Sequence, residues 1–182
     1  MAIRRILTYP DPLLHRISEP VTKFDLELSN LVNDMVETMR HAPGIGLAAP
    51  QVGELLRVIV VEIPPDREEE GKVSQLYAVC NPVISKRAGN AKIEEGCLSV
   101  PGFYVEVDRA AEVTIEGQNP DGTPFRYDSD GLTAICFQHE IDHLDGKLLI
   151  NYVSSTKRAL YRDELKRRQK TDGTVEDRRP AL

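Results

Sequence analysis

The spacing of apolar residues predicts three helices. Over residues 25–41, apolar side chains recur at every third or fourth position, as on a helix with one buried face. The same periodicity returns over residues 130–144, and Gly146 follows the last apolar position as a helix stop. A serine pair at positions 154 and 155 caps a third predicted helix, which runs to about residue 170.

Most of the chain between the first two helices predicts β-strands. Runs of β-branched or alternating residues occupy 56–61, 76–84, 91–94, 104–107, 111–116 and 124–127. The small residues of 44–53 predict a loop, and the charged segment 64–72 predicts a mobile surface loop.

Strands followed by helices, without regular alternation, indicate an α+β fold. We expect mostly antiparallel strands packed around a central helix, with a further helix at the C-terminus. One domain is expected over residues 1–170, with a flexible tail over residues 171–182.

The composition is that of an ordinary globular chain. Hydrophobic residues make up 41% and charged residues 29% of the 182 residues. No apolar run reaches the roughly 18–20 residues of a membrane span, and the first residues lack the apolar stretch of a secretory signal. We therefore expect a cytoplasmic protein that has no membrane partner.

Charge is distributed unevenly along the chain. The net charge is −6, yet residues 157–182 carry nine basic and five acidic residues. Lys157, Arg162 and Lys166 are among the cations of the last predicted helix, which could contact RNA phosphates. A solvated charged helix is the simpler interpretation and is the one we favour.

Two histidines one helical turn apart, His139 and His143, give the sharpest chemical signal. They share a helix face with apolar residues, so both rings are expected to face the interior. Unpaired buried polar groups cost roughly 1–3 kcal/mol each, and one metal ion shared by both rings removes most of that cost. Glu140 completes the pattern His-Glu-x-x-His, which favours a metal site over two histidines that merely hydrogen-bond to backbone or solvent.

A catalytic metal site needs a third protein ligand and an open position. The cysteines number three, in a chain without an export signal, which favours reduced thiols. Cys97 is the best-placed candidate because the glycines around it permit tight turns. Cys80, within a predicted strand, and Cys136, on the histidine helix, are better explained as core filling and as a pocket wall.

Three segments together resemble the peptide deformylases. They are Gly44-Ile45-Gly46-Leu47-Ala48-Ala49-Pro50-Gln51, Glu95-Gly96-Cys97-Leu98-Ser99 and Gln138-His139-Glu140-Ile141-Asp142-His143-Leu144. They occur in that family's order and spacing, and the resemblance covers about residues 1–170. The terminal helix is similar to that of the bacterial type-1 branch.

The resemblance implies an enzyme that removes the N-formyl group from the formyl-methionine of newly made polypeptides. It implies one divalent metal ion held by Cys97, His139 and His143, usually ferrous iron, with zinc, nickel or cobalt as substitutes. Glu140 would be the acid and base. Gln51 and the backbone N–H of Leu98 would face the oxyanion. The residues that would shape the substrate groove are Gly44, Ile45, Gly46, Glu95, Gly96, Leu132, Ile135 and Cys136.

Two positions depart from that family's commonest pattern. Pro50 stands where some members have threonine, at a position that takes no part in the reaction. Tyr104 stands where many have an arginine near the peptide backbone, which bears on substrate contacts outside the formyl group. Two other functions share the histidine pattern: a zinc peptidase, and a metal-binding protein without catalysis.

Overall fold

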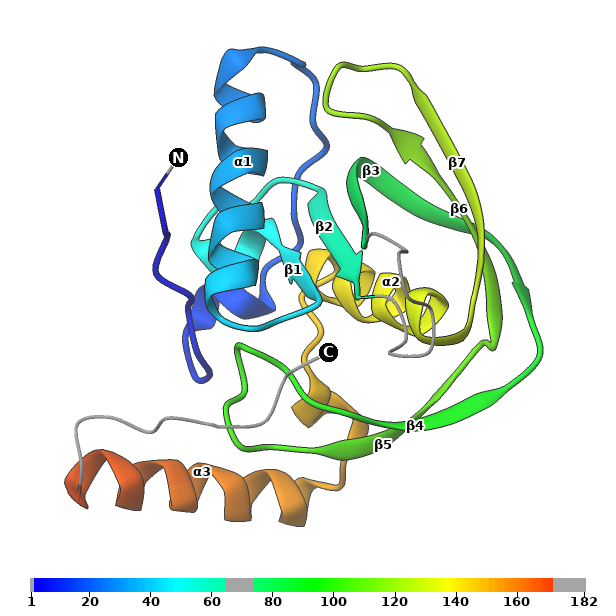
Figure 1. Cartoon of the computed structure of the whole chain (residues 1–182). Helices are drawn as coiled ribbons and strands as arrows, with labels where there is room; N and C mark the ends of the chain where they lie inside the picture. Colours follow the sequence, from blue (N-terminus) through cyan, green and yellow to red (C-terminus); the bar gives the residue numbers. More distant parts are fainter. Residues whose placement is uncertain (1, 65–73, 172–182) are drawn as a thin grey trace.

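The computed structural model describes residues 2–64 and 74–171, and it has an α+β architecture built around one central helix (Figure 1). The central helix is α2 (Gly131–Leu144), and an antiparallel five-stranded sheet curves around one side of it. In spatial order its strands are β1 (Gly46–Ala48), β2 (Val58–Ile63), β3 (Gln75–Ala88), β6 (Glu112–Gln118) and β7 (Pro124–Asp130). A separate hairpin of β4 (Ala91–Glu95) and β5 (Val105–Arg109) lies at another side of α2. The expected fold class is confirmed.

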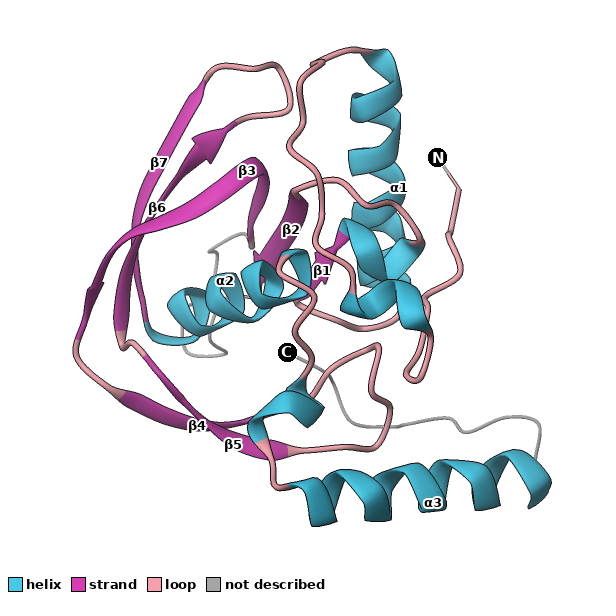
Figure 2. Cartoon of the chain, turned by 180° about the vertical axis from the view of Figure 1, so that it is seen from behind, coloured by secondary structure: helices cyan, strands magenta, loops and turns pink. Residues whose placement is uncertain are grey.

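The other two helices flank this centre (Figure 2). Helix α1 (Leu26–His41) begins where the Asp25 carboxylate accepts the N–H of Leu28 at 3.1 Å, and it packs its apolar face against β1 and β2. Helix α3 (Ser155–Thr171) lies outside the β4–β5 hairpin. It is anchored by Tyr161, whose ring centre is 4.8 Å from that of Phe103.

Helix α2 is buried on nearly all sides, because every residue over 134–141 is buried. The sheet packs against one side of it, and Glu95 and Arg109 of the β4–β5 hairpin contact another side through His139 and Asp142. A polar side chain on the buried stretch 134–141 is therefore removed from bulk water, whereas Asp142 keeps some exposure. That constraint makes polar residues on α2 costly unless each has a partner.

The long strand β3 bends so that the sheet can curve. Its pairing with β6 is irregular between Cys80 and Val83 and again between Ile84 and Lys86. At the first irregularity Asn81 has a positive φ of 52°, and its side-chain amide bonds to both the backbone N–H and C=O of Val21. The strand spans Gln75–Ala88 and is longer than the predicted 76–84.

The prediction of a loop over residues 44–53 is wrong. Residues Gly46–Ala48 form β1, which pairs with β2, and Ala49–Val52 form a short 3-10 helix, η2. The segment is too short and too rich in small residues to show a strand period, and only pairing with a neighbour makes it a strand. The predicted mobile loop lies outside the described residues except for Pro64, and so does the predicted tail except for Thr171, the last residue of α3. Within the described ranges, no helix has both the length and the apolar character to cross a membrane.

Replacing Gly146 by alanine should lower the free energy of unfolding by about 2–4 kcal/mol. Its φ is +71°, and an added Cβ would lie 2.6 Å from the backbone oxygen of His15. Gly53→Ala is the matched control, because Gly53 also has a positive φ (+90°) but no heavy atom within 4 Å of an added Cβ. That variant should lose only about 1 kcal/mol in urea unfolding. Equal losses in the two variants would contradict the proposed clash.

Candidate metal centre

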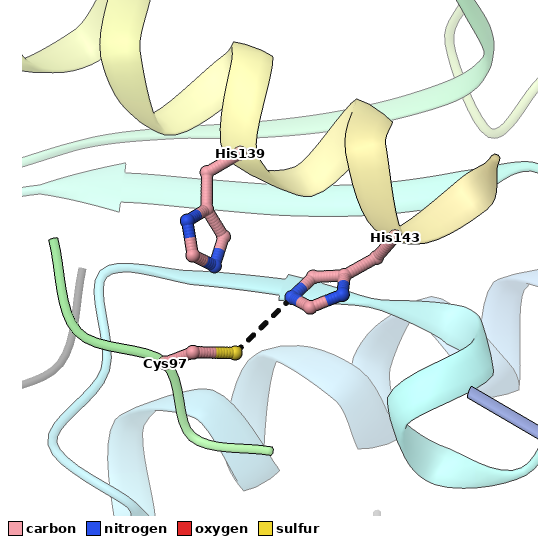
Figure 3. A group of neighbouring side chains, drawn as sticks. All are labelled: Cys97, His139 and His143. Carbon is pink, nitrogen blue, oxygen red and sulfur yellow. Dashed lines mark hydrogen bonds between the residues drawn. The ribbon is translucent and has the colours of Figure 1, made fainter. Parts of the chain in front are cut away.

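Three side chains that can bind a metal converge beside α2 (Figure 3). Cys97, His139 and His143 are buried, and their ligand atoms all lie within 4.8 Å of one another. Sγ of Cys97 is 3.3 Å from Nε2 of His143, and the two imidazole ring centres are 4.9 Å apart. A tetrahedral ion with bonds of about 2.0–2.3 Å separates its ligand atoms by about 3.3–3.8 Å, which matches the distance from Sγ to Nε2 of His143. The group therefore fits a divalent transition-metal ion.

The local structure explains why these three residues meet. His139 and His143 are four residues apart on α2, so both rings leave the same face of the helix toward Cys97. Cys97 follows the end of β4 in a tight turn, in which the N–H of Val100 donates to its carbonyl at 3.0 Å. The turn presents the thiol to the two rings while the chain reverses direction.

The carboxylate of Glu95 fixes the ring of His139. Its Oε2 lies 2.8 Å from Nδ1 of His139, which leaves Nε2 as the ring nitrogen available to an ion. Arg109 holds the same carboxylate through Nε at 2.7 Å and Nη2 at 2.9 Å. A carboxylate behind the imidazole is typical of metal-binding histidines, because it sets the tautomer and the ring orientation.

The charges around the site favour a cation at its centre. Burial acts to lower the pKa of His139, but its hydrogen bonds with Cys97 and Glu95 act the other way and raise the pKa well above the usual value. Burial and the nearby charge of His139 lower the pKa of His143 well below its usual value. Burial opposes ionisation of Glu95, yet Arg109 and His139 hold its pKa below normal. Positive charge is thus favoured at His139, whereas His143 is held in the neutral form, which is the form that binds a metal ion.

Glu140 lies directly beside the donor group and against β1. It is fully buried, and burial raises its pKa to about 8. A Cβ added to Gly46 would lie 2.2 Å from its Oε1 and 2.7 Å from Sγ of Cys136. Only glycine permits this approach of the β1 backbone to the carboxylate. Oε2 of Glu140 is buried and has no hydrogen-bond partner among the described residues, so this oxygen is available for a proton or for water.

The amide of Gln51 also faces the donor group. Its Oε1 accepts the N–H of Ala48 at 2.8 Å, which fixes the direction of the amide. Its Nε2 donates to Oγ of Ser99 at 3.1 Å and lies 3.8 Å from Sγ of Cys97. The sequence interpretation named Gln51 but missed Ser99, although Ser99 stands two residues after the cysteine.

The N-terminal segment ties the two loops of the site together. The N–H of Leu7 donates to the carbonyl of Gln51 at 2.7 Å, and the N–H of Tyr9 donates to the carbonyl of Ser99 at 2.8 Å. The side chain of Leu98 packs closely against the backbone of Gly44, since a Cβ added to Gly44 would lie 2.8 Å from it. The loops that carry the amide donor and the thiol are therefore held at a fixed separation.

The residues expected to line a substrate groove fall into two groups. Leu132 is 37% exposed and lies at the surface, whereas Ile135 and Cys136 are buried below it. Sγ of Cys136 lies 3.6 Å from the carbonyl of Ile45, so that thiol packs against the β1 segment. Glu95 differs from expectation, because its fully buried side chain points at Arg109 and His139 instead of into a groove.

Tyr104 lies next to the thiol loop. A Cβ on Gly96 would be 2.7 Å from its aromatic ring, so the glycine lets the ring pack against the backbone before Cys97. Arg109, which the sequence interpretation also missed, had a recognisable signal. In β5 the buried positions alternate with exposed ones, and this alternation places Arg109 on the buried face. A buried arginine requires a buried acid as its partner.

Comparison with known proteins agrees with this geometry. The profile of the family described as polypeptide deformylase matches residues 3–159. A peptide deformylase of Alkalilimnicola ehrlichii is 46% identical over 167 residues, covering 92% of this chain and 91% of that protein. One from Chromobacterium violaceum is 44% identical over 170 residues, covering 93% and 98%. The crystal structure of a peptide deformylase from Legionella pneumophila superposes with a TM-score of 0.83 at 44% identity, covering 94% of this chain and 99% of the other.

The chain freed of metal by a chelator should bind one Co²⁺ per molecule and develop a thiolate-to-metal absorption band. Cys97→Ala should lose that band and weaken binding by more than about 100-fold, because a ligand is removed outright. Cys80→Ala is the matched control, since Cys80 is also fully buried but lies in β3 away from the histidines. An unchanged band in Cys97→Ala would show that the thiol is not a ligand.

Proposed function

The chain belongs to the polypeptide deformylase family, and from that membership we propose how its residues remove the N-terminal formyl group of a polypeptide. The observation that carries the proposal is the convergence of Cys97, His139 and His143, with the carboxylate of Glu140 beside them. Cys97, His139 and His143 hold one divalent ion. When bound, this ion supplies a Lewis acid that makes water more acidic and polarises the formyl carbonyl.

Glu140 is the acid and base. Burial raises the pKa of its carboxyl, which favours its holding a proton taken from water. Its unpartnered Oε2 takes the proton from the attacking water and returns it to the amine that leaves. Such proton transfer is worth about 10²–10⁴-fold in rate. The backbone of Gly46 against Oε1 keeps the carboxylate in place for both transfers.

Gln51 and the backbone N–H of Leu98 stabilise the oxyanion. The Gln51 amide is fixed in advance by Ala48, and its Nε2 already lies beside the sulfur of Cys97. The N–H of Leu98 belongs to the turn that carries the thiol. A donor that is oriented before the reaction needs no reorganisation during it, and losing one such donor costs about 10²–10³-fold in rate.

The peptide binds as an added strand beside β1. β1 is at the edge of the five-stranded sheet, paired with β2 on one side only. An extended peptide can bond to such an edge through its main chain, while alternate side chains enter pockets. Leu132, Ile135 and Cys136 form the apolar wall that receives the methionine side chain. Tyr104 offers an uncharged surface beside Gly96, so this part of the groove attracts acidic residues of the peptide less than an arginine would.

Ferrous iron is the metal that we propose for the cell, with zinc, nickel or cobalt as substitutes. One thiolate and two imidazoles suit several of these ions, so the donor set restricts the metal without choosing it. A thiolate beside iron implies sensitivity to oxygen. The cytoplasmic location expected from the sequence stays a prediction. A zinc peptidase is disfavoured as an alternative, because the family match extends over residues 3–159 and includes the cysteine segment.

Contact of α3 with ribosomal RNA also stays a prediction. The helix buries Tyr161 and exposes cations that include Arg162 and Lys166, whereas Lys157 is partly engaged at 5.6 Å over the ring of Phe103. The same exposure suits a solvated helix. Salt-dependent binding of ribosomes that survives truncation after Ser155 would exclude the contact.

Glu140→Ala should keep its metal and lose activity on a formyl-methionyl peptide by about 10²–10⁴-fold. Glu140→Gln, which preserves the volume of the side chain, should lose a similar factor because an amide cannot take the proton. Metal content measured on the same samples is the control. Loss of the metal in these variants would reassign Glu140 to ligation.

The chain should hydrolyse formyl-methionyl peptides at least about 100-fold faster, in kcat/KM, than acetyl-methionyl peptides. The extra methyl group must fit where Gly46, Gln51 and the Cys97 turn already approach closely. The comparison is made by quantifying the free amine released from the two substrates. Equal turnover would contradict a space closed around the formyl carbon.

A further inference from the structure

A chain of hydrogen bonds runs from His139 to the surface of the molecule. Beyond Glu95 and Arg109, it continues through Asp142, whose Oδ2 accepts Nη1 of Arg109 at 2.6 Å. The hydroxyl of Tyr152 donates to the same Oδ2 at 2.5 Å. Tyr152 is the last residue of the 3-10 helix η3 (Leu149–Tyr152), outside the three sequence segments that identify the family.

Tyr152 contacts this hydrogen-bond network in three ways. Its hydroxyl donates to Asp142 and accepts Nη1 of Arg109 at 3.4 Å. Its ring lies under the Arg109 guanidinium, with Cζ 5.1 Å from the ring centre. Arg109 is 7% exposed whereas Tyr152 is 40% exposed, so the ring separates the guanidinium from solvent. The hydroxyl and the Asp142 carboxylate both contact Nη1 of Arg109, the guanidinium nitrogen that Glu95 does not bind.

Without the hydroxyl, Asp142 has a competing partner. Its other oxygen, Oδ1, is 4.0 Å from Nζ of the exposed Lys147, and both residues border a surface cavity of about 550 Å³. Rotation of the carboxylate toward Lys147 or water in this cavity would withdraw Oδ2 from Arg109. Arg109 would then have lost both the Asp142 carboxylate and the 3.4 Å hydrogen bond to the Tyr152 hydroxyl, which leaves Glu95 as its carboxylate partner among the described residues.

We propose that Tyr152 is a positioning residue for the metal centre. Its hydroxyl holds Asp142, Asp142 aligns Arg109, Arg109 orients Glu95, and Glu95 sets the ring of His139. The inference rests on the proposed binding of an ion by Cys97, His139 and His143. Partners that directly orient a ligand commonly change metal affinity by about 10–100-fold. Tyr152 is farther from the ligand in this hydrogen-bond network, so we expect its loss to weaken metal binding by about 3–10-fold.

The test is Co²⁺ titration of the full chain, freed of metal and kept anaerobic, with Tyr152→Phe compared with wild type. This change removes only the hydroxyl and keeps the ring below Arg109. The dissociation constant should rise about 3–10-fold, and the Co²⁺ ligand-field spectrum should shift. The control is Tyr127→Phe, which removes a hydroxyl hydrogen-bonded to Tyr77 on the sheet. Tyr127→Phe should leave both readings unchanged, and the two variants should have similar melting temperatures without metal.

A second comparison tests the route through Asp142. In an Asp142→Ala background, which removes the acceptor of the Tyr152 hydroxyl, Tyr152→Phe should change the dissociation constant less than it does in wild type, because only the 3.4 Å hydrogen bond from Arg109 to the hydroxyl remains to be lost. A wild-type affinity and spectrum in Tyr152→Phe would overturn the inference, and so would a full-sized loss in the Asp142→Ala background. If wild type formed no thiolate band with Co²⁺, the proposed metal centre itself would fail, and this inference with it. The thiolate band of wild type therefore distinguishes failure of the metal centre from failure of the role proposed for Tyr152.

Discussion

The buried carboxylate of Glu95 is the constraint on which the rest of the site depends. A fully buried charge costs several kcal/mol unless it is paired and hydrogen-bonded. Here Arg109 donates two hydrogen bonds to it, and His139 occupies the remaining direction. The pairing makes the charge tolerable and gives the imidazole one orientation. The donor atoms of Cys97 and His143 can then share a position with a nitrogen that does not rotate away.

The surrounding fold is organised to bring backbone close to these charges. α2 is buried on nearly all sides, so its polar residues must find partners inside the protein. The sheet wraps around the helix through a bulged β3, and β1 approaches Glu140 so closely that position 46 admits only a glycine. The N-terminal segment then joins the loops of Gln51 and Ser99 by backbone hydrogen bonds. The same close packing that excludes water also limits the size of what can react there.

Sequence and structure agree where the signal is local. The three helices and most of the strands follow from periodicity, and the pairing of His139 with His143 follows from helical spacing. The interactions behind the ligands are different. Arg109 lies 14 residues from Glu95 and Tyr152 lies 10 residues from Asp142, on different elements, so helical or strand periodicity within one element does not pair them. Glu95 shows the limit, since it was expected to shape the substrate groove, whereas its buried side chain bonds to Arg109 and His139. β1 was missed for a related reason, because a three-residue strand is defined by its partner.

X-ray absorption spectroscopy of anaerobically purified protein tests the proposed metal centre most directly, because it identifies the element and its neighbours together. We predict iron as the principal metal, with one sulfur neighbour at about 2.3 Å and nitrogen neighbours at about 2.0–2.1 Å, distances taken from comparable zinc sites. Another divalent ion with the same sulfur and nitrogen neighbours would change only the choice of metal. A metal surrounded by oxygen and nitrogen alone, with no sulfur, would contradict ligation by Cys97 and with it the proposed chemistry.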